Sequence, residues 1–324
     1  MRFSGEFAIR GHRSRAGSCP FGSDGPGRDR TRDSNAYAKH QVELVATTNP
    51  YGWVTRYARR RHGHPKPGPR RRPSVFGAGG SIGAAVARAF STEGAEVFLA
   101  GRTKSSLDTV ARQIDDRGGR AHTAVVDALD DTAVAEYLGR VAEQAGGIDI
   151  EFNATGPRVA DYGTGVPAVD LPLEQFLSAQ TVLTSQFITA RCAARRMAAQ
   201  GSGVVIFLTG SPARPHTPGT TGIGAAFAGI ENLTRTMALE LSGTGVRVVC
   251  LRTAANPDSR TIQDVADASA RGRDETLRSL ADSTMLKVSP HTEDTANGAV
   301  LLASDRARML TGTVHNGTAG VCRD

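Results

Sequence analysis

Residues 75–90 read VFGAGGSIGAAVARAF, and this stretch decides the fold. Its glycines stand between two apolar residues and a segment in which Ile82, Val86 and Phe90 recur at the spacing of one helix face. The glycines are Gly77, Gly79, Gly80 and Gly83. Glycines at a strand-to-helix turn let backbone N–H groups approach a pyrophosphate, whose charge is then met by the positive end of the helix. The stretch therefore predicts a phosphate-binding loop of the dinucleotide-binding type.

Apolar, strand-like runs alternate with helical patterns after this loop. The runs are AEVFLA (95–100), RAHTAVV (120–126), IDIEFN (148–153), GVVIFLT (203–209) and VRVVCL (246–251). Between the first two runs, Leu107, Val110 and Ile114 recur at i, i+3 and i+7, as on one face of a helix. Alternation of this kind predicts an α/β fold, a Rossmann-type doubly wound parallel sheet in three α/β/α layers.

The first 73 residues differ from the rest in composition. They are rich in Arg, Gly, Pro, His and Ser, show no apolar period, and end in PKPGPRRRP (65–73). Residues 1–72 hold 16 Lys and Arg against 5 Asp and Glu, and the remainder holds 23 against 27. The net charge of +7 therefore belongs to the first part. We interpret residues 1–73 as a disordered basic arm and 74–324 as the domain; an arm that contacts nucleic acid or a membrane surface is the open alternative.

The cysteines and the hydropathy exclude several classes of protein. Cys19, Cys192, Cys250 and Cys322 lie far apart, without a CxxC pair or a histidine at ligand spacing, so the sequence predicts no metal site and no redox dithiol. No apolar run approaches the roughly 18 residues of a membrane span, and the N-terminus lacks the apolar core of a secretory signal. We expect a soluble, cytoplasmic protein.

The segment that should form the first strand is unusually short. In such a sheet this strand is central and buried on both faces, so it should be a continuous apolar run without proline. Here Pro73 and Ser74 directly precede Val75. Either the strand is only two or three residues long, or residues 1–74 are not the native lead-in, because the reading frame or start site upstream is wrong. We favour the second explanation.

From the glycine loop to its end, over about 250 residues, the chain resembles the short-chain dehydrogenase/reductase family. The family glycine motif TGxxxGxG falls on Phe76, Gly77, Ser81 and Gly83. VVDALD (125–130), DIEFNATG (149–156), AGIENLTRTMALEL (228–241) and ANGAVLLASDRARMLTGTVHNGTAG (296–320) resemble later family segments in the family order. The cofactor-binding residues that we expect from the loop and the resemblance are Gly77, Gly79, Gly80, Ser81, Ile82, Gly83, Arg102, Asp127, Asn153 and Gly156.

Arg102 indicates which dinucleotide is bound. It follows the second strand, where family members that prefer NAD usually carry an acidic residue for the ribose 2′-hydroxyl, and FLAGRTK (98–104) contains no carboxylate. A guanidinium at this place can pair with a 2′-phosphate through two hydrogen bonds, and Lys104 could add a point charge. We expect NADP(H) to be favoured over NAD(H).

The catalytic half of the family pattern is missing. The family relay uses a serine after the fifth strand, YxxxK some 12 or 13 residues later, and an asparagine in the fourth helix. On this chain Ile223 falls on the tyrosine, Phe227 on the lysine and Val182 on the asparagine, and only the serine survives, as Ser211. In the family the lysine lowers the pKa of the tyrosine so that it acts as a base. The chain therefore resembles a divergent member that lacks the YxxxK motif.

Two further residues could take over proton transfer. Tyr162 in GPRVADYGTG (156–165) could project over the nicotinamide, and so could His216 in SPARPHTPG (211–219), whose imidazole titrates near neutrality. With Ser211, they are the candidate catalytic residues; Thr209 and a bound water are further possible donors. Residues 257–287 are polar and contain no strand, which is typical of an inserted helical lid over a cleft.

The leading functional hypothesis is an NAD(P)(H)-dependent oxidoreductase that acts on a carbonyl or alcohol substrate with an atypical proton donor. The alternative is a catalytically inactive or non-redox protein that binds NADP(H). The expected partners are a small-molecule substrate and further copies of the chain, rather than nucleic acid or a membrane. Candidates for the contact between copies, divided between core and interface, are Phe176, Leu183, Phe187, Leu233, Met237 and Leu241.

Overall fold

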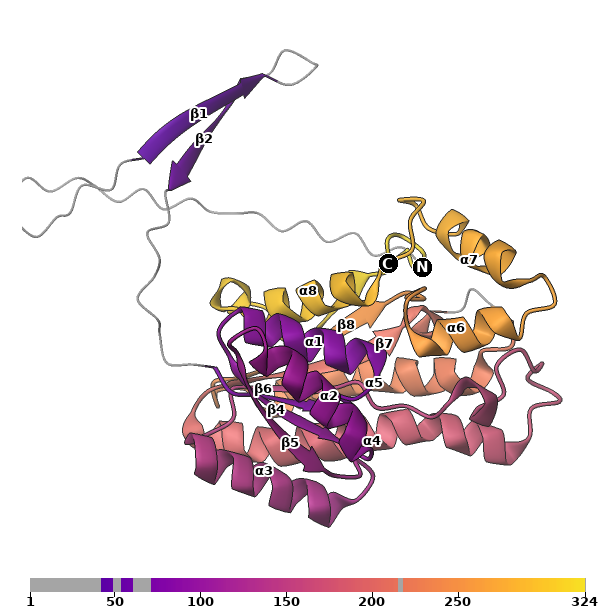
Figure 1. Ribbon diagram of the computed structural model, residues 1–324, viewed down its shortest axis with the longest axis horizontal. Coiled ribbons are helices and arrows are strands. Elements are labelled where there is room, and N and C mark those ends of the chain that lie inside the picture. The colour runs from indigo at the N-terminus through magenta and orange to yellow at the C-terminus, as the bar shows by residue number, and fades with distance from the viewer. Residues whose placement is uncertain (1–41, 49–53, 61–70, 215–217, 324) are drawn as a thin grey trace, which may run out of the picture. The chain divides into compact units, whose positions relative to one another are not determined.

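The structure is a computed structural model, and it describes residues 42–48, 54–60, 71–214 and 218–323. The chain divides into two units, Met1–Lys66 and Pro67–Asp324. In the first unit, strands β1 (Val42–Thr48) and β2 (Val54–Arg60) form an antiparallel pair (Figure 1). The sequence analysis missed this pair because neither segment has the regular apolar and polar alternation of a half-buried strand.

The second unit is built on a sheet of seven strands that all run parallel. The strands are β3 (Pro73–Phe76), β4 (Glu96–Gly101), β5 (Arg120–Val125), β6 (Ile150–Asn153), β7 (Gly203–Gly210), β8 (Val246–Thr253) and β9 (Thr313–Gly317). Their spatial order is β5-β4-β3-β6-β7-β8-β9, so the direction of winding reverses between β3 and β6. This is the doubly wound parallel sheet that the sequence predicts.

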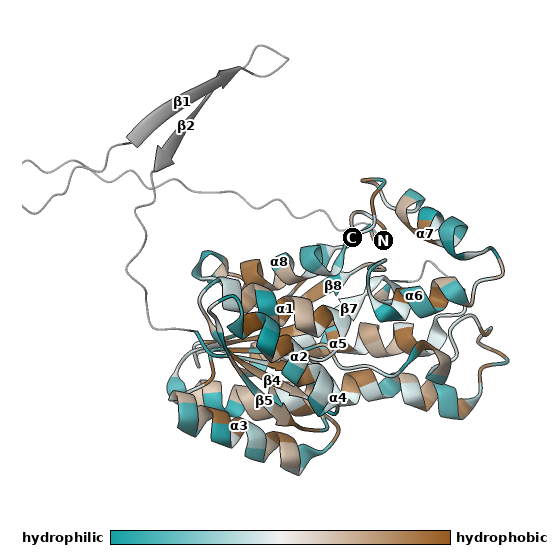
Figure 2. Ribbon diagram, in the orientation of Figure 1, coloured by the Kyte–Doolittle hydropathy of each residue, from teal (hydrophilic) through white to brown (hydrophobic). Residues whose placement is uncertain are grey.

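Helices cover both faces of the sheet and complete the three layers (Figure 1). One face carries α1 (Ser81–Thr92), α2 (Lys104–Asp115) and α8 (Thr292–Ala303). The other face carries α3 (Asp131–Ala145), α4 (Leu173–Gln200) and α5 (Thr221–Glu240). Figure 2 shows apolar residues on the strands and on the inner sides of these helices. The predicted apolar face of α2 is confirmed, because Leu107, Val110 and Ile114 are all buried.

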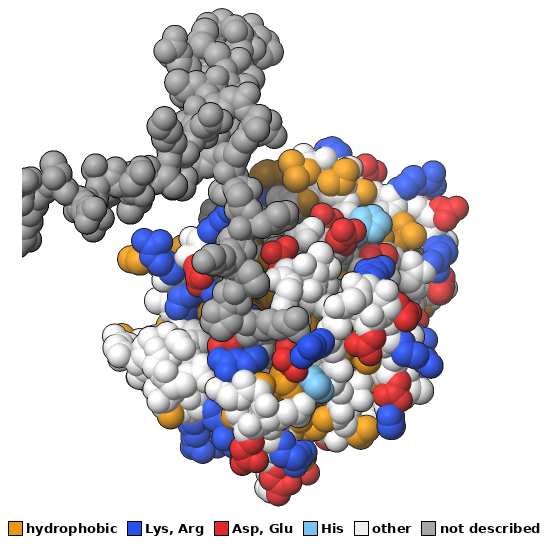
Figure 3. Space-filling model, turned by 60° about the vertical axis from the view of Figure 1, so that its left-hand side comes forward, with side chains coloured by type: hydrophobic (Ala, Val, Ile, Leu, Met, Phe, Trp, Pro, Cys, Tyr) orange, Lys and Arg blue, Asp and Glu red, His pale blue; other side chains and the backbone are white. Residues whose placement is uncertain are grey.

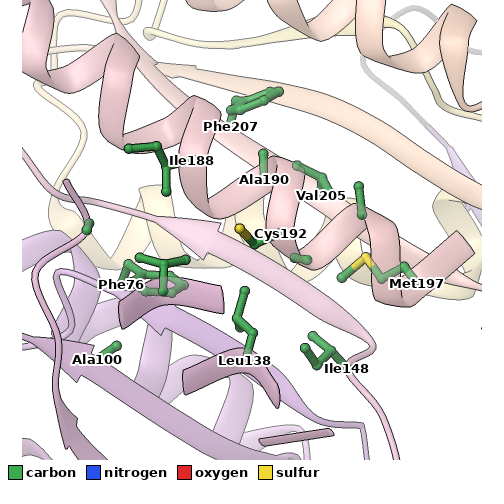
Figure 4. Packing of buried hydrophobic residues seen from close by; sticks show 14 of the residues in the cluster. Phe76, Ala100, Leu138, Ile148, Ile188, Ala190, Cys192, Met197, Val205 and Phe207 are labelled. Carbon is green, nitrogen blue, oxygen red and sulfur yellow. The ribbon is translucent and has the colours of Figure 1, made fainter. Parts of the chain in front are cut away.

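The larger core cluster lies between the sheet and the layer of α3, α4 and α5. Ile188, Cys192 and Met197 of α4 lie over residues of several strands (Figure 4). Those strand residues include Phe76 of β3 and Val205 and Phe207 of β7. The strands are apolar on both faces because both are covered, as expected for a parallel sheet.

The central strand β3 is four residues long and starts at Pro73. A proline is tolerated as the first residue of a strand, since the missing N–H then lies outside the ladder. The two preceding arginines belong to the fold: the Arg72 guanidinium pairs with Asp149 (Nε to Oδ2, 2.7 Å), and Arg71 pairs with Asp305. The lead-in to the sheet therefore begins before the predicted boundary at residue 74, and the strand has four residues rather than the two or three of the first explanation. The second explanation, a wrong reading frame or start site upstream, stays a prediction.

The surface of the second unit carries charges of both signs. In the face that Figure 3 presents, Lys and Arg side chains alternate with Asp and Glu side chains, without one broad area of a single sign. This fits the near balance of charges after residue 72, where 23 basic residues face 27 acidic ones. Among the described residues, none of the helices combines the length and the apolar character that crossing a bilayer requires.

Candidate active site

A cavity of about 710 Å³ opens where the strands of the second unit end. Its wall is formed by residues that follow β3, β4, β5 and β6, by side chains of α4, and by Arg260. The loops after β3 and β6 flank the point at which the strand order reverses. Ligands of doubly wound sheets bind in the crevice at such a switch point.

The backbone of the glycine loop leaves no room for side chains at two of its glycines. Gly77 has φ +70°, and a Cβ there would lie 2.8 Å from the carbonyl carbon of Ala154 in the loop after β6. A Cβ on Gly83 would lie 2.3 Å from the Gly77 oxygen, so glycine at position 83 lets α1 pack directly on the loop. No side chain caps the N-terminus of α1, which leaves its first N–H groups available to an anion. The loop therefore fits a pyrophosphate.

Arg102 lies in the wall of the cavity at the end of β4. Its guanidinium is exposed and has no hydrogen-bond or ion-pair partner in the described ranges 71–214 and 218–323. Lys104, which we expected to add a positive charge for the 2′-phosphate, forms an ion pair within its own helix. Its ammonium pairs with Asp108 one turn further along α2 (Nζ to Oδ2, 2.8 Å), because lysine and aspartate four residues apart share a helix face.

The expected cofactor residues fall into two groups. Six line the cavity, namely Gly77, Gly79, Gly80, Arg102, Asp127 and Gly156. The other four, Ser81, Ile82, Gly83 and Asn153, are outside its wall. The hydroxyl of Ser81 accepts a hydrogen bond from the backbone N–H of Arg260 (3.1 Å). The family's middle glycine is thus replaced by a residue that joins α1 to the inserted segment.

Asn153 supports the cavity from below, where it is 1% exposed. Its Nδ2 donates to the hydroxyl of Thr189 (3.0 Å), and its Oδ1 accepts from the hydroxyl of Thr155 (2.6 Å). Thr155 in turn shares a hydrogen bond of 2.8 Å with Ser185, and both line the cavity. Asn153 therefore positions a pair of hydroxyl groups rather than touching a ligand itself.

The sequence analysis missed the hydroxyl groups of α4. Ser178, Thr181 and Ser185 all line the cavity. The signal was present, because their spacing of i, i+3 and i+7 places them on one helix face. It was hidden by the apolar residues between them, which suggest core packing.

The residues that the resemblance assigns to the family relay are packed and apolar. Ile223 (7% exposed) and Val182 (4% exposed) belong to the core cluster, and Phe227 packs against it. The Phe227 ring reaches the end of β7, where a Cβ on Gly210 would lie 3.0 Å from its Cε2 atom. Phe227 is the residue that the resemblance aligns with the family's lysine.

The candidate proton donors are placed differently from one another. Ser211 follows β7 and is 8% exposed, and its hydroxyl makes no hydrogen bond within the described part of the chain. Thr209 is buried, and its hydroxyl contacts the Cys250 sulfur at 3.4 Å. Neither Ser211 nor Tyr162 lines the cavity. His216 lies outside the described residues.

Tyr162 lacks the electrostatic environment of a catalytic base. It packs against the larger core cluster, and burial raises the pKa of its phenol, opposed only by a hydrogen bond with Thr164. A base would need a lowered pKa, which a neighbouring positive charge produces. Tyr162 therefore stays protonated at neutral pH and is not suited to act as a base.

Two short helices occupy the segment expected to form a lid. They are α6 (Arg260–Asp267) and α7 (Arg273–Asp282). Both ends of the segment are anchored: the Asn256 amide donates to the Pro290 oxygen (2.9 Å), and the Asp258 carboxylate accepts from the Thr292 N–H (3.0 Å). The chain therefore leaves and re-enters the domain at two places that are hydrogen-bonded to each other. The first helix of the segment, α6, begins beside the cavity.

Comparison with known proteins agrees with this geometry. The family model described as enoyl-(acyl carrier protein) reductase matches residues 77–321. An uncharacterized oxidoreductase of Mycobacterium tuberculosis is 31% identical over 239 residues, which is 74% of this chain and 87% of that protein. The cis-4-hydroxycyclohexanecarboxylate dehydrogenase of Sinomonas cyclohexanicum is 29% identical and covers 74% of this chain and 92% of its own.

A solved structure extends the likeness to the fold. It is described as an NAD(P)-dependent gluconate 5-dehydrogenase from Beutenbergia cavernae with bound NADP. It is 26% identical, covers 78% of this chain and 96% of its own, and superimposes with a TM-score of 0.69. The sequence match and the fold agree over the second unit. The chain belongs to the short-chain dehydrogenase/reductase family.

Proposed function

We propose that the chain is an NADP(H)-dependent oxidoreductase that interconverts a carbonyl and an alcohol with an atypical proton donor. The observation that carries the proposal is the Arg102 guanidinium, which stands in the wall of a cavity built around a phosphate-binding loop and has no partner in the described part of the chain. A guanidinium there suits a 2′-phosphate. Relatives named oxidoreductase and dehydrogenase, and one solved with NADP, support the same reading.

The residues of the chain divide the work between binding and polarisation. The glycine loop and the start of α1 would hold the pyrophosphate, and Arg102 the 2′-phosphate. When bound, the nicotinamide supplies or accepts the hydride. We assign to Ser211 the hydrogen bond that polarises the substrate carbonyl, with the proton drawn from water. Tyr162 and His216 are the alternatives for this role.

Kinetics test the oxidoreductase proposal. NADPH oxidation is measured with a panel of aldehydes and ketones, for the wild type and for Ser211→Ala. We expect turnover of at least one class of carbonyl, and a loss of about 10²–10³ in kcat for Ser211→Ala, as for removal of one polarising donor. Ser202→Ala, which changes an exposed serine just before β7, is the matched control and should leave kcat unchanged. A full rate in Ser211→Ala would move the role to Tyr162 or His216.

The alternative function is a protein that binds NADP(H) without redox turnover. One observation favours it: all three relay positions, Ile223, Phe227 and Val182, hold packed apolar side chains. The same kinetic panel separates the two functions. Saturable NADPH binding without turnover of any carbonyl would select the alternative.

Restoring the family's tyrosine and lysine should not create a fast reductase. In Ile223→Tyr with Phe227→Lys, the lysine would stand in the apolar space that Phe227 fills against the core cluster and Gly210. Burial there lowers the pKa of a lysine and removes the positive charge that should acidify the tyrosine. We expect NADPH-dependent turnover within about tenfold of the wild type, well short of the 10²–10⁴ that a working general acid contributes. Adding Val182→Asn tests whether the missing asparagine matters; high turnover by the double variant alone contradicts this expectation.

We also propose that the inserted segment is a lid and that the chain forms a homo-oligomer through α4 and α5. Apolar side chains on the outer sides of these helices support the second proposal, with Leu177 55% exposed, Phe187 42% and Leu239 76%. Met237, one of the residues expected at an interface or in the core, is buried. Light scattering that gives a monomer mass at micromolar concentration would refute the oligomer.

A further inference from the structure

Arg260 reaches the dinucleotide cavity from a distant part of the sequence. It is the first residue of α6 in the inserted segment, and it lines the same cavity as Gly77, Gly79 and Gly80 of the glycine loop. Its backbone N–H donates to the Ser81 hydroxyl at the start of α1 (3.1 Å). Arg260 and the phosphate-binding loop are therefore tied together by a direct hydrogen bond.

The base of the inserted segment holds Arg260 in this place. Asp258, two residues earlier, accepts hydrogen bonds from the N–H and the hydroxyl of Thr292 (3.0 and 2.5 Å). Ser259, between them, is 5% exposed, and its hydroxyl donates to the Asn256 oxygen (2.7 Å). These hydrogen bonds fix the backbone on the N-terminal side of Arg260. The position of Arg260 beside the glycine loop therefore does not depend on the remainder of the inserted segment.

The positive charge of the Arg260 guanidinium is not paired with a carboxylate in the described part of the chain. It is exposed and makes no hydrogen bond or ion pair within residues 71–214 and 218–323. The two carboxylates in the cavity wall are engaged elsewhere: Asp161 accepts from Arg158 (3.3 Å), and Asp127 accepts from the Leu129 N–H (3.0 Å). A cation placed beside a loop suited to phosphate is complementary to an anionic ligand there.

We propose that Arg260 is a phosphate-binding residue of this site, whose guanidinium pairs with the pyrophosphate of the dinucleotide from the side of the inserted segment. The inference rests on the proposed function. Two arginines then share the ligand: Arg102 after β4 reads the 2′-phosphate and so distinguishes NADP(H) from NAD(H), whereas Arg260 reads the pyrophosphate that both cofactors contain. The inserted segment thereby contacts the bound cofactor through the first residue of α6.

The test measures binding rather than turnover. NADPH, NADH and ADP-ribose are titrated calorimetrically into the full chain, in the wild type and in Arg260→Ala, Arg260→Lys and Arg102→Ala. A hydrogen bond to a charged group is worth about 1.5–3 kcal/mol, which corresponds to about a 10- to 100-fold change in Kd. We expect Arg260→Ala to weaken all three ligands by a similar factor in this range, and Arg260→Lys to recover part of it. Arg102→Ala should weaken NADPH alone.

The control is Arg278→Ala, which removes an exposed arginine from α7 of the same segment, away from the cavity, and should leave every Kd unchanged. Unchanged affinities in Arg260→Ala overturn the inference, while the proposed function stands. An effect on NADPH alone would assign Arg260 to the 2′-phosphate instead, and an effect that spares ADP-ribose would assign it to the nicotinamide half; each overturns the pyrophosphate assignment. A wild type that binds neither NADPH nor NADH defeats the proposed function itself.

Discussion

Replacing Glu231 by glutamine should cost the folded protein about 3–5 kcal/mol of stability, the range observed when one partner of a buried ion pair is removed. Glu231 of α5 is 4% exposed, and Arg252 of β8 is 0% exposed. Their side chains meet in two parallel contacts, Nε to Oε1 at 2.6 Å and Nη2 to Oε2 at 2.9 Å. Glu231→Gln removes the negative charge and leaves the Arg252 guanidinium charged inside the protein, where solvation by water is lost.

Urea denaturation of three variants separates the charge pair from simple packing. We expect a large loss for Glu231→Gln and also for Arg252→Met, but a smaller loss for the double variant Glu231→Leu with Arg252→Met, because no uncompensated charge remains in it. The exposed pair of Glu136 and Arg140 on α3, 3.9 Å apart, is the control, and Glu136→Gln should change stability by less than about 1 kcal/mol. If Glu231→Gln and Arg252→Met each lower the free energy of unfolding by less than about 1 kcal/mol, the buried pair is not needed for the fold.

Replacing Glu151 by glutamine should stabilise the protein, and more so at high pH. Glu151 lies in strand β6, next to β3 in the sheet, is 1% exposed, and has no hydrogen-bond partner for either carboxylate oxygen in the described part of the chain. Burial raises its pKa to about 8, with the nearby hydroxyl of Thr189 acting in the opposite direction. A carboxyl group whose pKa is raised in the folded protein lowers the stability at every pH at which the unfolded chain has already lost the proton.

The sign of the pH dependence follows from this raised pKa. Below the usual value near 4.5 the carboxyl is neutral in both folded and unfolded chains, so it does not oppose folding. As the pH rises towards 8, the unfolded chain releases the proton and the folded chain retains it, so stability falls. The advantage of Glu151→Gln should therefore grow by about 2–3 kcal/mol between pH 5 and pH 7, at 1.36 kcal/mol per pKa unit.

Chemical denaturation at several pH values measures this difference between variant and wild type. Glu143→Gln, on the exposed side of α3, is the matched control and should show no growing difference over the same range. An advantage of Glu151→Gln that stays constant from pH 5 to pH 8 would mean that the carboxyl is ionised in the folded chain as it is in the unfolded chain, and would contradict the raised pKa.

The fold could be predicted because its signals are local and repeat along the chain. Each of these signals lies within a short stretch of sequence: the glycine loop, the apolar strands and the apolar face of α2. The order of these elements along the chain is enough to define a doubly wound sheet. The strand β3 was harder to predict, because Arg71 and Arg72 look like part of a basic arm. Their partners Asp305 and Asp149 are remote in sequence, and only the folded chain brings them together.

The site could be predicted only in part, for a similar reason. Residues that follow strands, such as Arg102 and Asp127, are placed by the topology, so position in sequence was sufficient. Arg260 belongs to an excursion whose path is set by contacts with Thr292 and Ser81, and nothing in its own segment points to the glycine loop. The absence of a lysine at Phe227 was visible in the sequence, whereas the tight packing of that ring against Gly210 was not.

The central claim is that the chain has kept a site for NADP(H). Calorimetric titration of NADPH and NADH into the wild type and Arg102→Ala tests it most directly. We expect saturable binding of both cofactors, with NADPH tighter by about tenfold or more, and loss of that preference in Arg102→Ala, because the charge-assisted hydrogen bond to the 2′-phosphate is removed. Equal affinity of the wild type for NADPH and NADH would contradict the role of Arg102, and the absence of binding by either would contradict the claim itself.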